Sequence, residues 1–356
     1  MKPLSVTDIV SPAWCELQYW YSLTKYGKIK RTPAMKQGSR VHRDLEAQVH
    51  DIVPIEVETR EDAFGLRIWN VIQGLRTLRT TGLTRELEVW GVLDGEVING
   101  VIDELSYTCP DPDFEKALEA SREDPAASRP PNQLSIKDFF AQRSSSSTSA
   151  PANSAPPPKI YLTDIKTRTT NTLPQGAALK TVRLQLQLYH HLLRALAAGT
   201  VPGEAIFSRY QLDSAAPLSA SVAAALTALE SASTPSPPPT SASSPSPPTT
   251  LSTLWATLAA ELAATPAPSA VLHASFRAQA DGTPLGSAVF AADEAALGAH
   301  VARALAWWRG TRPPRGVDVE DAFKCRACEF AEGCAWRAGK VREAVRRSRA
   351  RWGREG

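Results

Sequence analysis

The sequence contains few cysteines, no long apolar run and no strong excess of either charge. Its 356 residues include five cysteines, and the formal net charge is +3. No stretch approaches the ~20 consecutive apolar residues of a transmembrane helix. The phosphate-binding pattern G-x4-G-K-[ST] is also missing, so we expect no nucleotide-driven motor. These absences predict a soluble protein that is neither a disulfide scaffold, a membrane protein nor a helicase.

Four of the cysteines form the most informative pattern in the chain. One lies near the start and three form a C-x2-C-x5-C cluster near the end: Cys15, Cys325, Cys328 and Cys334. In a reducing compartment such thiols bind metal more often than they form disulfides. We therefore expect one metal site that joins the first helix to the 325–334 segment. The spacing alone leaves zinc and an iron-sulfur cluster open. Cys109 lies apart and is expected to be a free thiol.

Basic residues gather towards both ends of the chain. They are Lys25, Lys28, Lys30, Arg31, Lys36 and Arg40 near the start, and Arg342, Arg346, Arg347, Arg349, Arg351 and Arg354 near the end. Such runs indicate either a polyanionic partner or charge that keeps exposed ends soluble.

Two segments have the composition of disorder. Residues 110–158 contain SSSSTSAPANSAPPP, and residues 231–250 contain TPSPPPTSASSPSPPTT. Neither can bury enough apolar surface to offset the entropy of ordering it. Because the cost of closing a loop grows only slowly with its length, a folded domain tolerates both as insertions. We expect residues 1–356 to form a single domain around them.

The remaining sequence predicts helices and strands in a mixed order. Apolar residues at helical spacing predict helices at 11–26 and 34–50. Asp94-Gly95, between two apolar runs, predicts a hairpin of strands 85–93 and 96–107, with Gly100 as a bulge. The other expected elements are strands at 159–167 and 204–212, a hairpin at 271–291, and helices at 176–198 and through Trp307 and Trp308. This order predicts an α/β protein with a small mixed sheet flanked by helices.

Two aspartates and a lysine on neighbouring strands form the strongest candidate site. Asp103 lies in GVIDEL, and Asp164 and Lys166 lie in LTDIKTR. Strand alternation places Asp164 and Lys166 on the same face of the sheet. Two carboxylates from adjacent strands can bind Mg²⁺ or Mn²⁺, and a lysine beside the metal can orient or deprotonate water. A lone Asp-x-Lys is usually a surface ion pair, but Asp103 on the neighbouring strand favours a catalytic site.

Two helical motifs fit the same site. Gly38-x3-His42 offers a histidine as a third metal ligand or a phosphate contact. Gln185 and Tyr189 lie one helical turn apart, so both can reach one bound strand. Taken alone, each motif is more often structural, as a satisfied histidine or as the polar edge of an amphipathic helix.

In this order the motifs resemble the RecB-like branch of the PD-(D/E)XK nuclease superfamily. One cysteine before the motifs and three after them narrow the resemblance to the iron-sulfur nucleases of that branch. SPAWCELQYWYSL and GVDVEDAFKCRACEFAEGCAWR are similar to the exonuclease V family in particular. The resemblance covers residues 1–109, 159–212 and 271–340 and fails in the insertions. It implies a restriction-endonuclease-like mixed sheet flanked by helices and closed by the four-cysteine cluster.

The resemblance implies a role for each matching residue. The Mg²⁺ ligands would be Asp103, Asp164, the backbone carbonyl of Ile165, His42 and, for a second metal, Glu88. The catalytic residues would be Asp103, Asp164, Lys166 and His42. The DNA-binding residues would be Gln185, Tyr189 and Arg168. Many members of the family have Glu where Asp164 stands, a difference of one methylene group.

The same resemblance implies cofactors, substrate and location. Cys15, Cys325, Cys328 and Cys334 would hold a structural 4Fe-4S cluster, and Mg²⁺, or Mn²⁺ in its place, would support hydrolysis. The protein would be a monomeric exonuclease on single-stranded DNA that acts in DNA repair, in the nucleus, the mitochondrion or both. The residues leave two alternatives: a structure-specific endonuclease on the same core, and a non-catalytic nucleic-acid-binding scaffold held by its metal. A scaffold has no need of Asp103, Asp164 and Lys166.

One motif in the first insertion is independent of this site. In residues 133–140, Gln133 is followed by Ile136, Phe139 and Phe140 within otherwise polar, proline-rich sequence. The pattern resembles the peptide that docks on the sliding clamp PCNA: one helical turn would present the three apolar side chains together and Gln133 at the edge. A short helix covering the sheet, or a chance match, is the alternative. We favour the clamp interpretation.

Overall fold

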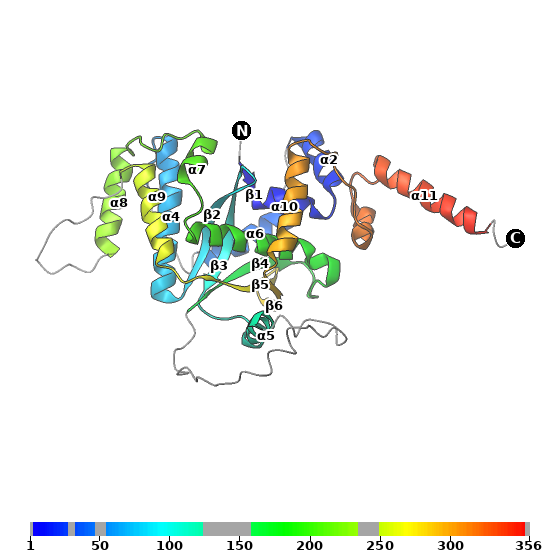
Figure 1. The fold of residues 1–356 in the computed structure, drawn as a ribbon, viewed down its shortest axis with the longest axis horizontal. Helices are drawn as coiled ribbons and strands as arrows, with labels where there is room; N and C mark the ends of the chain where they lie inside the picture. Colours follow the sequence, from blue (N-terminus) through cyan, green and yellow to red (C-terminus); the bar gives the residue numbers. More distant parts are fainter. Residues whose placement is uncertain (1–2, 28–32, 47–54, 124–157, 234–248, 353–356) are drawn as a thin grey trace, which may run out of the picture.

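A mixed sheet of six strands forms the centre of the described part of the molecule (Figure 1). The structure, a computed structural model, describes residues 3–27, 33–46, 55–123, 158–233 and 249–352. The strands are β1 Leu4–Ser5, β2 Leu83–Leu93, β3 Glu96–Ser106, β4 Ile160–Arg168, β5 Pro268–Ala278 and β6 Pro284–Ala291. The β1–β3 and β4–β5 pairs are parallel, and the β2–β3, β3–β4 and β5–β6 pairs are antiparallel. The predicted mixed sheet is confirmed.

Helices flank this sheet, also as predicted. They are α1 Val6–Val10, α2 Glu16–Tyr26, α3 Pro33–Glu46, α4 Arg60–Thr81, α5 Pro112–Glu123, α6 Lys180–Ala197, α7 Gly203–Tyr210, α8 Ala220–Ser233, α9 Leu251–Ala263, α10 Glu294–Trp308 and α11 Ala335–Trp352. The 3-10 segments are η1 Ser11–Ala13, η3 Gly176–Leu179 and η4 Val319–Ala327. In Figure 1, α4 and α9 run side by side next to β2, and α11 extends away from the body of the molecule.

The core lies between the sheet and the helices that contact it. Helix α6 contacts β2, β3, β4 and β5, and α4 lies between β2 and α9. Ile68 and Ile72 of α4 and Trp90 of β2 are fully buried. The ends of α4 are encoded locally: Thr59 forms a capping box with Asp62, and Gly82 ends the helix in a left-handed conformation. These contacts fix the position of β2, which pairs with the strand that carries Asp103.

Three expectations about local structure are wrong. Residues 204–212 were expected to form a strand, but α7 begins after Pro202, whose fixed φ suits a helix start. The insertion expected to be disordered from residue 110 begins with α5, whose Glu115 accepts hydrogen bonds from Tyr161 and Ser269. Gly100 forms no bulge. It pairs regularly with Val89, and a side chain there would collide with Tyr189 of α6.

The first and last parts of the described chain lie against each other. Glu16 in α2 receives two hydrogen bonds from Arg312, each of 2.6 Å, and the Leu17 amide donates to the carbonyl of Arg315. Deeper in the same region, Asp8 accepts from Tyr19, and its backbone carbonyl accepts from Trp308. Within the described residues, none of the helices has the length and apolar character needed to cross a membrane.

Candidate active site

Asp103, Asp164 and Lys166 come together where β3 and β4 separate. The antiparallel pairing of the two strands includes Glu104 with Thr163, so the two aspartates occupy the next position along. The Ile165 amide donates a hydrogen bond of 2.6 Å to Asp103 Oδ2. This bond holds the Asp103 carboxylate against β4 and brings it to the strand that carries the second carboxylate.

Asp164 is the most deeply buried acid of the site. It is 1% exposed, and its Oδ1 accepts a 2.6 Å hydrogen bond from Lys166 Nζ. Its Oδ2 is buried without any hydrogen-bond partner. A buried carboxylate oxygen without a partner is costly unless a ligand completes it. The donor set therefore fits a divalent cation, which takes carboxylate oxygens as ligands.

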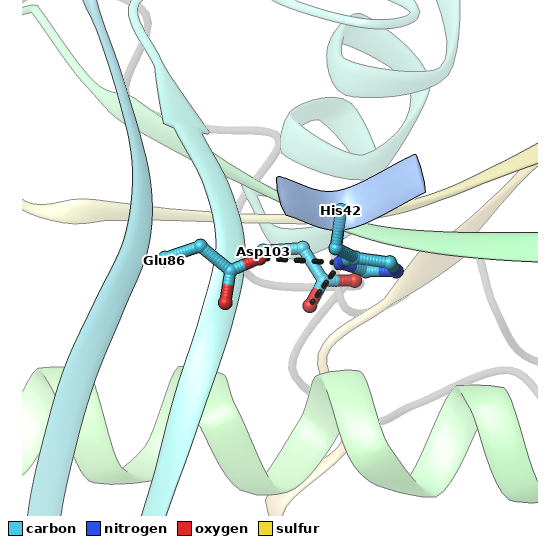
Figure 2. A group of neighbouring side chains, drawn as sticks. All are labelled: His42, Glu86 and Asp103. Atoms are coloured by element: carbon cyan, nitrogen blue, oxygen red, sulfur yellow. Dashed lines mark hydrogen bonds and ion pairs between the residues drawn. The ribbon is translucent and has the colours of Figure 1, made fainter. Parts of the chain in front are cut away.

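His42 approaches the aspartates from α3. Its Nε2 lies 3.1 Å from the carbonyl oxygen of Ile165, the backbone atom expected as a metal ligand. Its Nδ1 lies 3.2 Å from Glu86 Oε1 and 3.7 Å from Asp103 Oδ1. Figure 2 shows the three side chains pointing towards one another from α3, β2 and β3. The structure thus brings His42 to the predicted site.

Glu86 belongs to this group but was not predicted from the sequence, whereas Glu88, which was predicted, lies elsewhere. The Glu88 carboxylate accepts hydrogen bonds from both ends of the Arg67 guanidinium group and from Asn99. Strand alternation gave no reason to separate the two glutamates, because residues two apart share a face in a regular strand. The signal that distinguishes them is a backbone angle that the sequence does not display.

The charges of the site influence one another strongly. Burial, followed by the negative charge of Asp164, raises the pKa of Asp103 to about 7. Burial alone would lower the pKa of Lys166, but the charges of Asp164 and Asp103 outweigh it and the net shift is upward. The hydrogen bond with Glu86 raises the pKa of His42. Two close, buried carboxylates repel each other, and this is the electrostatic setting in which a divalent cation is favoured.

The Gln185-x3-Tyr189 motif of the helix after β4 also lies at the site. Gln185 Nε2 donates a 3.1 Å hydrogen bond to the Tyr189 hydroxyl. Burial and the nearby charges of Asp164 and Asp103 raise the pKa of Tyr189. Arg168 lies two residues beyond Lys166, at the end of β4, and donates to Thr170. Of the positions predicted to contact DNA, Tyr189 thus lies near the carboxylates and Gln185 is bound to it, while Arg168 lies on the strand that carries Asp164.

The four cysteines of the predicted metal site line one cavity: Cys15, Cys325, Cys328 and Cys334. The rest of the lining is largely apolar and aromatic, with Trp14, Tyr21 and Phe330 among its members. Burial, and then the neighbouring Cys325, raises the pKa of Cys15 to about 11. Four thiols in one apolar cavity fit a cluster held by cysteine thiolates, and they also fit zinc.

Two predicted features lie outside this arrangement. Cys109 lies away from the cavity, beside Tyr161 and Glu115. The predicted clamp-binding peptide, with Gln133, Ile136, Phe139 and Phe140, falls outside the described residues.

The mixed sheet presents two buried carboxylates and a lysine, and a histidine lies beside them. These are the groups that a metal-assisted hydrolase uses. Comparison with known proteins assigns the family. The family model described as "Exonuclease V - a 5′ deoxyribonuclease" matches residues 1–337. The chain therefore belongs to the exonuclease V family and is a nuclease.

Curated relatives agree with this assignment. Exonuclease V of Danio rerio is 28% identical over 342 residues, which are 95% of this chain and 71% of that protein. Mitochondrial exonuclease V of Candida glabrata is 27% identical over 227 residues, or 54% of this chain and 42% of that protein. Mitochondrial exonuclease V of Candida albicans is 38% identical over 102 residues, or 28% of this chain and 15% of that protein. The matches thus span less than half of these yeast relatives.

Proposed function

We propose that this protein is a Mg²⁺-dependent exonuclease that degrades single-stranded DNA in DNA repair and carries a structural 4Fe-4S cluster. The fold is proposed to be the restriction-endonuclease-like PD-(D/E)XK fold, with Asp103, Asp164 and Lys166 as its signature. The observation that carries the proposal is the buried Asp164 carboxylate, which has Lys166 on one oxygen and no partner on the other. The family description supports deoxyribonuclease activity.

Each side chain of the site is proposed to have its own role in hydrolysis. Asp103, Asp164, His42 and the Ile165 carbonyl would hold the cation. When bound, a divalent cation neutralises charge on the phosphate and lowers the pKa of a water molecule. Lys166, which donates a hydrogen bond to Asp164, would orient that water and stabilise negative charge that develops on the phosphate. Arg168, at the end of the same strand, is proposed to bind the phosphate of the adjoining nucleotide.

Exposed aromatic and basic groups support a single-stranded substrate. Trp20 and Phe323 are 42% and 57% exposed, and bases stack on such rings without regard to sequence. Helix α11 presents a row of arginines, of which Arg347 pairs with Glu343. Contacts of basic groups with phosphates make affinity depend on salt. These features favour a single strand as the substrate.

Digestion of end-labelled DNA tests the activity and its mechanism. With Mg²⁺ present, anaerobically purified protein is expected to degrade linear single strands and to leave duplexes and circular single strands intact. Asp164→Ala and Lys166→Ala are each expected to lower the rate roughly 1,000-fold, since these contacts are worth several kcal/mol in the transition state. Asp281→Ala, in the exposed β5–β6 turn, serves as the control. Activity that survives in both site variants would refute the mechanism, and cleavage of circles would indicate an endonuclease.

The clamp-like peptide predicts a partner and a location. We propose that residues 133–140 bind PCNA, which would place the protein in the nucleus, while the yeast relatives are named mitochondrial. Replacing Phe139 and Phe140 by Ala should abolish retention on a PCNA column, because the two rings form most of the apolar plug. Nuclease activity should be unchanged in this variant. Equal retention of the variant and the parent protein would contradict the proposal.

A further inference from the structure

Glu86 has a backbone conformation that is unusual for its place in the sheet. Its φ is +51°, in the left-handed region that residues with a side chain rarely occupy. Among the described residues, the other non-glycine positions with positive φ are Asp94 and Gln211. Asp94 lies in the turn between β2 and β3, and Gln211 ends α7. Glu86 instead lies within β2, where this conformation costs about 1–3 kcal/mol, and residues with such a conformation cluster at functional sites.

The unusual angle changes the direction of the side chains on either side of it. Thr84 and Leu87 both lie against Gly74 of α4, although residues three apart point to opposite faces of a regular strand. Conversely, Glu86 and Glu88 should share a face, yet Glu88 pairs with Arg67 of α4 and Glu86 contacts His42 of α3. The left-handed residue therefore directs the Glu86 carboxylate away from α4 and into the active site.

In the active site the Glu86 carboxylate lies beside two other potential metal ligands, and the three residues come from three different elements. One ligand atom each from His42, Glu86 and Asp103 lies within 4.8 Å of the others, the spacing of groups that share a metal ion (Figure 2). The side chains of His42 and Glu86 are 24% and 27% exposed, so ions from solvent can reach them. Asp164 neighbours Asp103 on the side of Asp103 away from Glu86. Its Oδ2 is fully buried and has no hydrogen-bond partner. Asp103 thus lies between two groups of potential metal ligands, one with Glu86 and His42 and the other with Asp164.

We propose that Glu86 is a metal ligand, and that with His42 and Asp103 it holds a second divalent cation on the β2 side of the site. This inference rests on the proposed function, which places the first cation between Asp103 and Asp164. It reassigns His42 from that cation to the second one, because a neutral imidazole has one free lone pair, and His42 Nδ1 faces Glu86 while Nε2 faces the Ile165 carbonyl oxygen. Asp103 then serves both cations, as the shared carboxylate does in two-metal phosphodiester hydrolysis. A nitrogen ligand beside two carboxylates suits Mn²⁺ better than Mg²⁺. Mn²⁺ is therefore the probe of choice.

Counting bound Mn²⁺ by electron paramagnetic resonance tests the assignment without measuring activity. The unaltered protein is expected to bind two Mn²⁺ ions at this site. Glu86→Gln keeps the size of the side chain and an oxygen that can accept from His42, but it lacks the charge. It is expected to retain one ion and to bind the second at least tenfold more weakly. Glu46→Gln removes the same charge from the end of α3, outside the group, and should bind Mn²⁺ as the unaltered protein does.

Thermal melting distinguishes a lost ligand from a damaged fold. Without cations, Glu86→Gln should melt within a few degrees of the unaltered protein, because glutamine keeps an oxygen that accepts from His42 and loses only the charge of a partly exposed pair. With Mn²⁺, its melting temperature should rise less than that of the unaltered protein, since a ligand of the folded state stabilises in proportion to its binding. If Glu86→Gln binds both ions normally while Asp164→Ala loses one, the Glu86 assignment is wrong and the proposed function stands. If Asp164→Ala also binds normally, both fail.

Discussion

Gly38 shows how one small residue sets the distance between a helix and the active-site strand. A Cβ atom at position 38 would lie 2.9 Å from Thr167 Oγ1 of β4, closer than unbonded atoms tolerate. The same helix carries His42 one turn later, with its ring on the carbonyl of Ile165. The Gly-x3-His spacing therefore has a steric cause: the glycine permits the approach that lets the histidine reach the site.

Replacing Gly38 by Ala tests this cause. Helix propensity alone favours Ala by about 1 kcal/mol, so the variant should fold. Its nuclease rate should nevertheless fall roughly 10- to 100-fold, because α3 moves outward and misplaces His42. Adding Thr167→Ala removes the colliding oxygen and should restore most of the rate, while Thr167→Ala alone should be nearly neutral. If the rate changes of the two single variants simply multiply in the double variant, Gly38 and Thr167 do not act through a direct contact.

His190 of α6 predicts how stability depends on pH. It is 3% exposed, and burial lowers its pKa from 6.5 to about 4, with a further lowering from Arg194 that Glu294 opposes. Between these pH values the unfolded chain binds the proton and the folded chain does not. Stability is therefore complete above pH 6.5 and falls as the pH drops towards 4, by about 3 kcal/mol from this residue.

Urea unfolding of the unaltered protein and of His190→Gln, each measured from pH 4 to pH 7, isolates this contribution. The variant should lose less stability than the unaltered protein as the pH falls, because glutamine does not titrate. The difference between the two proteins should level off above pH 6.5. Parallel curves across the whole range would show that the buried ring is not responsible.

Only some residues of the candidate site could be predicted from the sequence. Asp103, Asp164 and Lys166 follow from strand alternation, which the regular strand β4 obeys. Glu86 does not, because a single left-handed residue breaks the alternation in β2. A local backbone angle is set by the packing of the strand between α3 and α4, and nothing in the run RELEV signals it.

At the scale of elements, the sequence predicted best where one pattern dominates. The β2–β3 hairpin follows from Asp94-Gly95, and the β4 and β5–β6 boundaries lie close to those expected. Helix α4 was missed because its buried residues face both β2 and α9 and leave no single apolar stripe. Helix α7 was mistaken for a strand because a short run with Ile206 and Phe207 fits either element until its packing is known.

Helix α5 shows how good local helix propensity and tertiary contacts together order part of a segment whose overall composition predicts disorder. Its Glu115 accepts hydrogen bonds from Tyr161, Lys159 and Ser269, which belong to or adjoin β4 and β5. The composition of residues 110–158 as a whole predicted disorder, but these contacts fall within its first turns. Average composition conceals a short ordered piece at the edge of such a segment.

At the scale of the molecule, the ends of the fold are joined in two independent ways. The four cysteines meet in one cavity, and polypeptide contacts lie beside it, notably the two hydrogen bonds from Arg312 to Glu16. Lys180 at the start of α6 also binds Asp318, just before the segment that carries Cys325. Helix α2 and η4 therefore have anchors that need no cofactor. The chain beyond Cys328 relies more on the cavity, through Phe330 and Trp336.

If the cysteines hold the proposed cluster, replacing Cys15 by Ser is expected to remove it and to loosen this last part of the chain. Iron and sulfide content should fall from about four atoms each per chain to near zero, because a cluster of this type needs four thiolates. The melting temperature should fall by roughly 5–10 °C, the effect of losing a few kcal/mol of binding energy. Chymotrypsin should then cut after Phe330 and Trp336 while α2 stays intact, held by Arg312.

Cys109→Ser, outside the cavity, should match the unaltered protein in all three measurements. Zinc in place of iron in the unaltered protein would refute the cluster and leave the structural role of the cysteines in place.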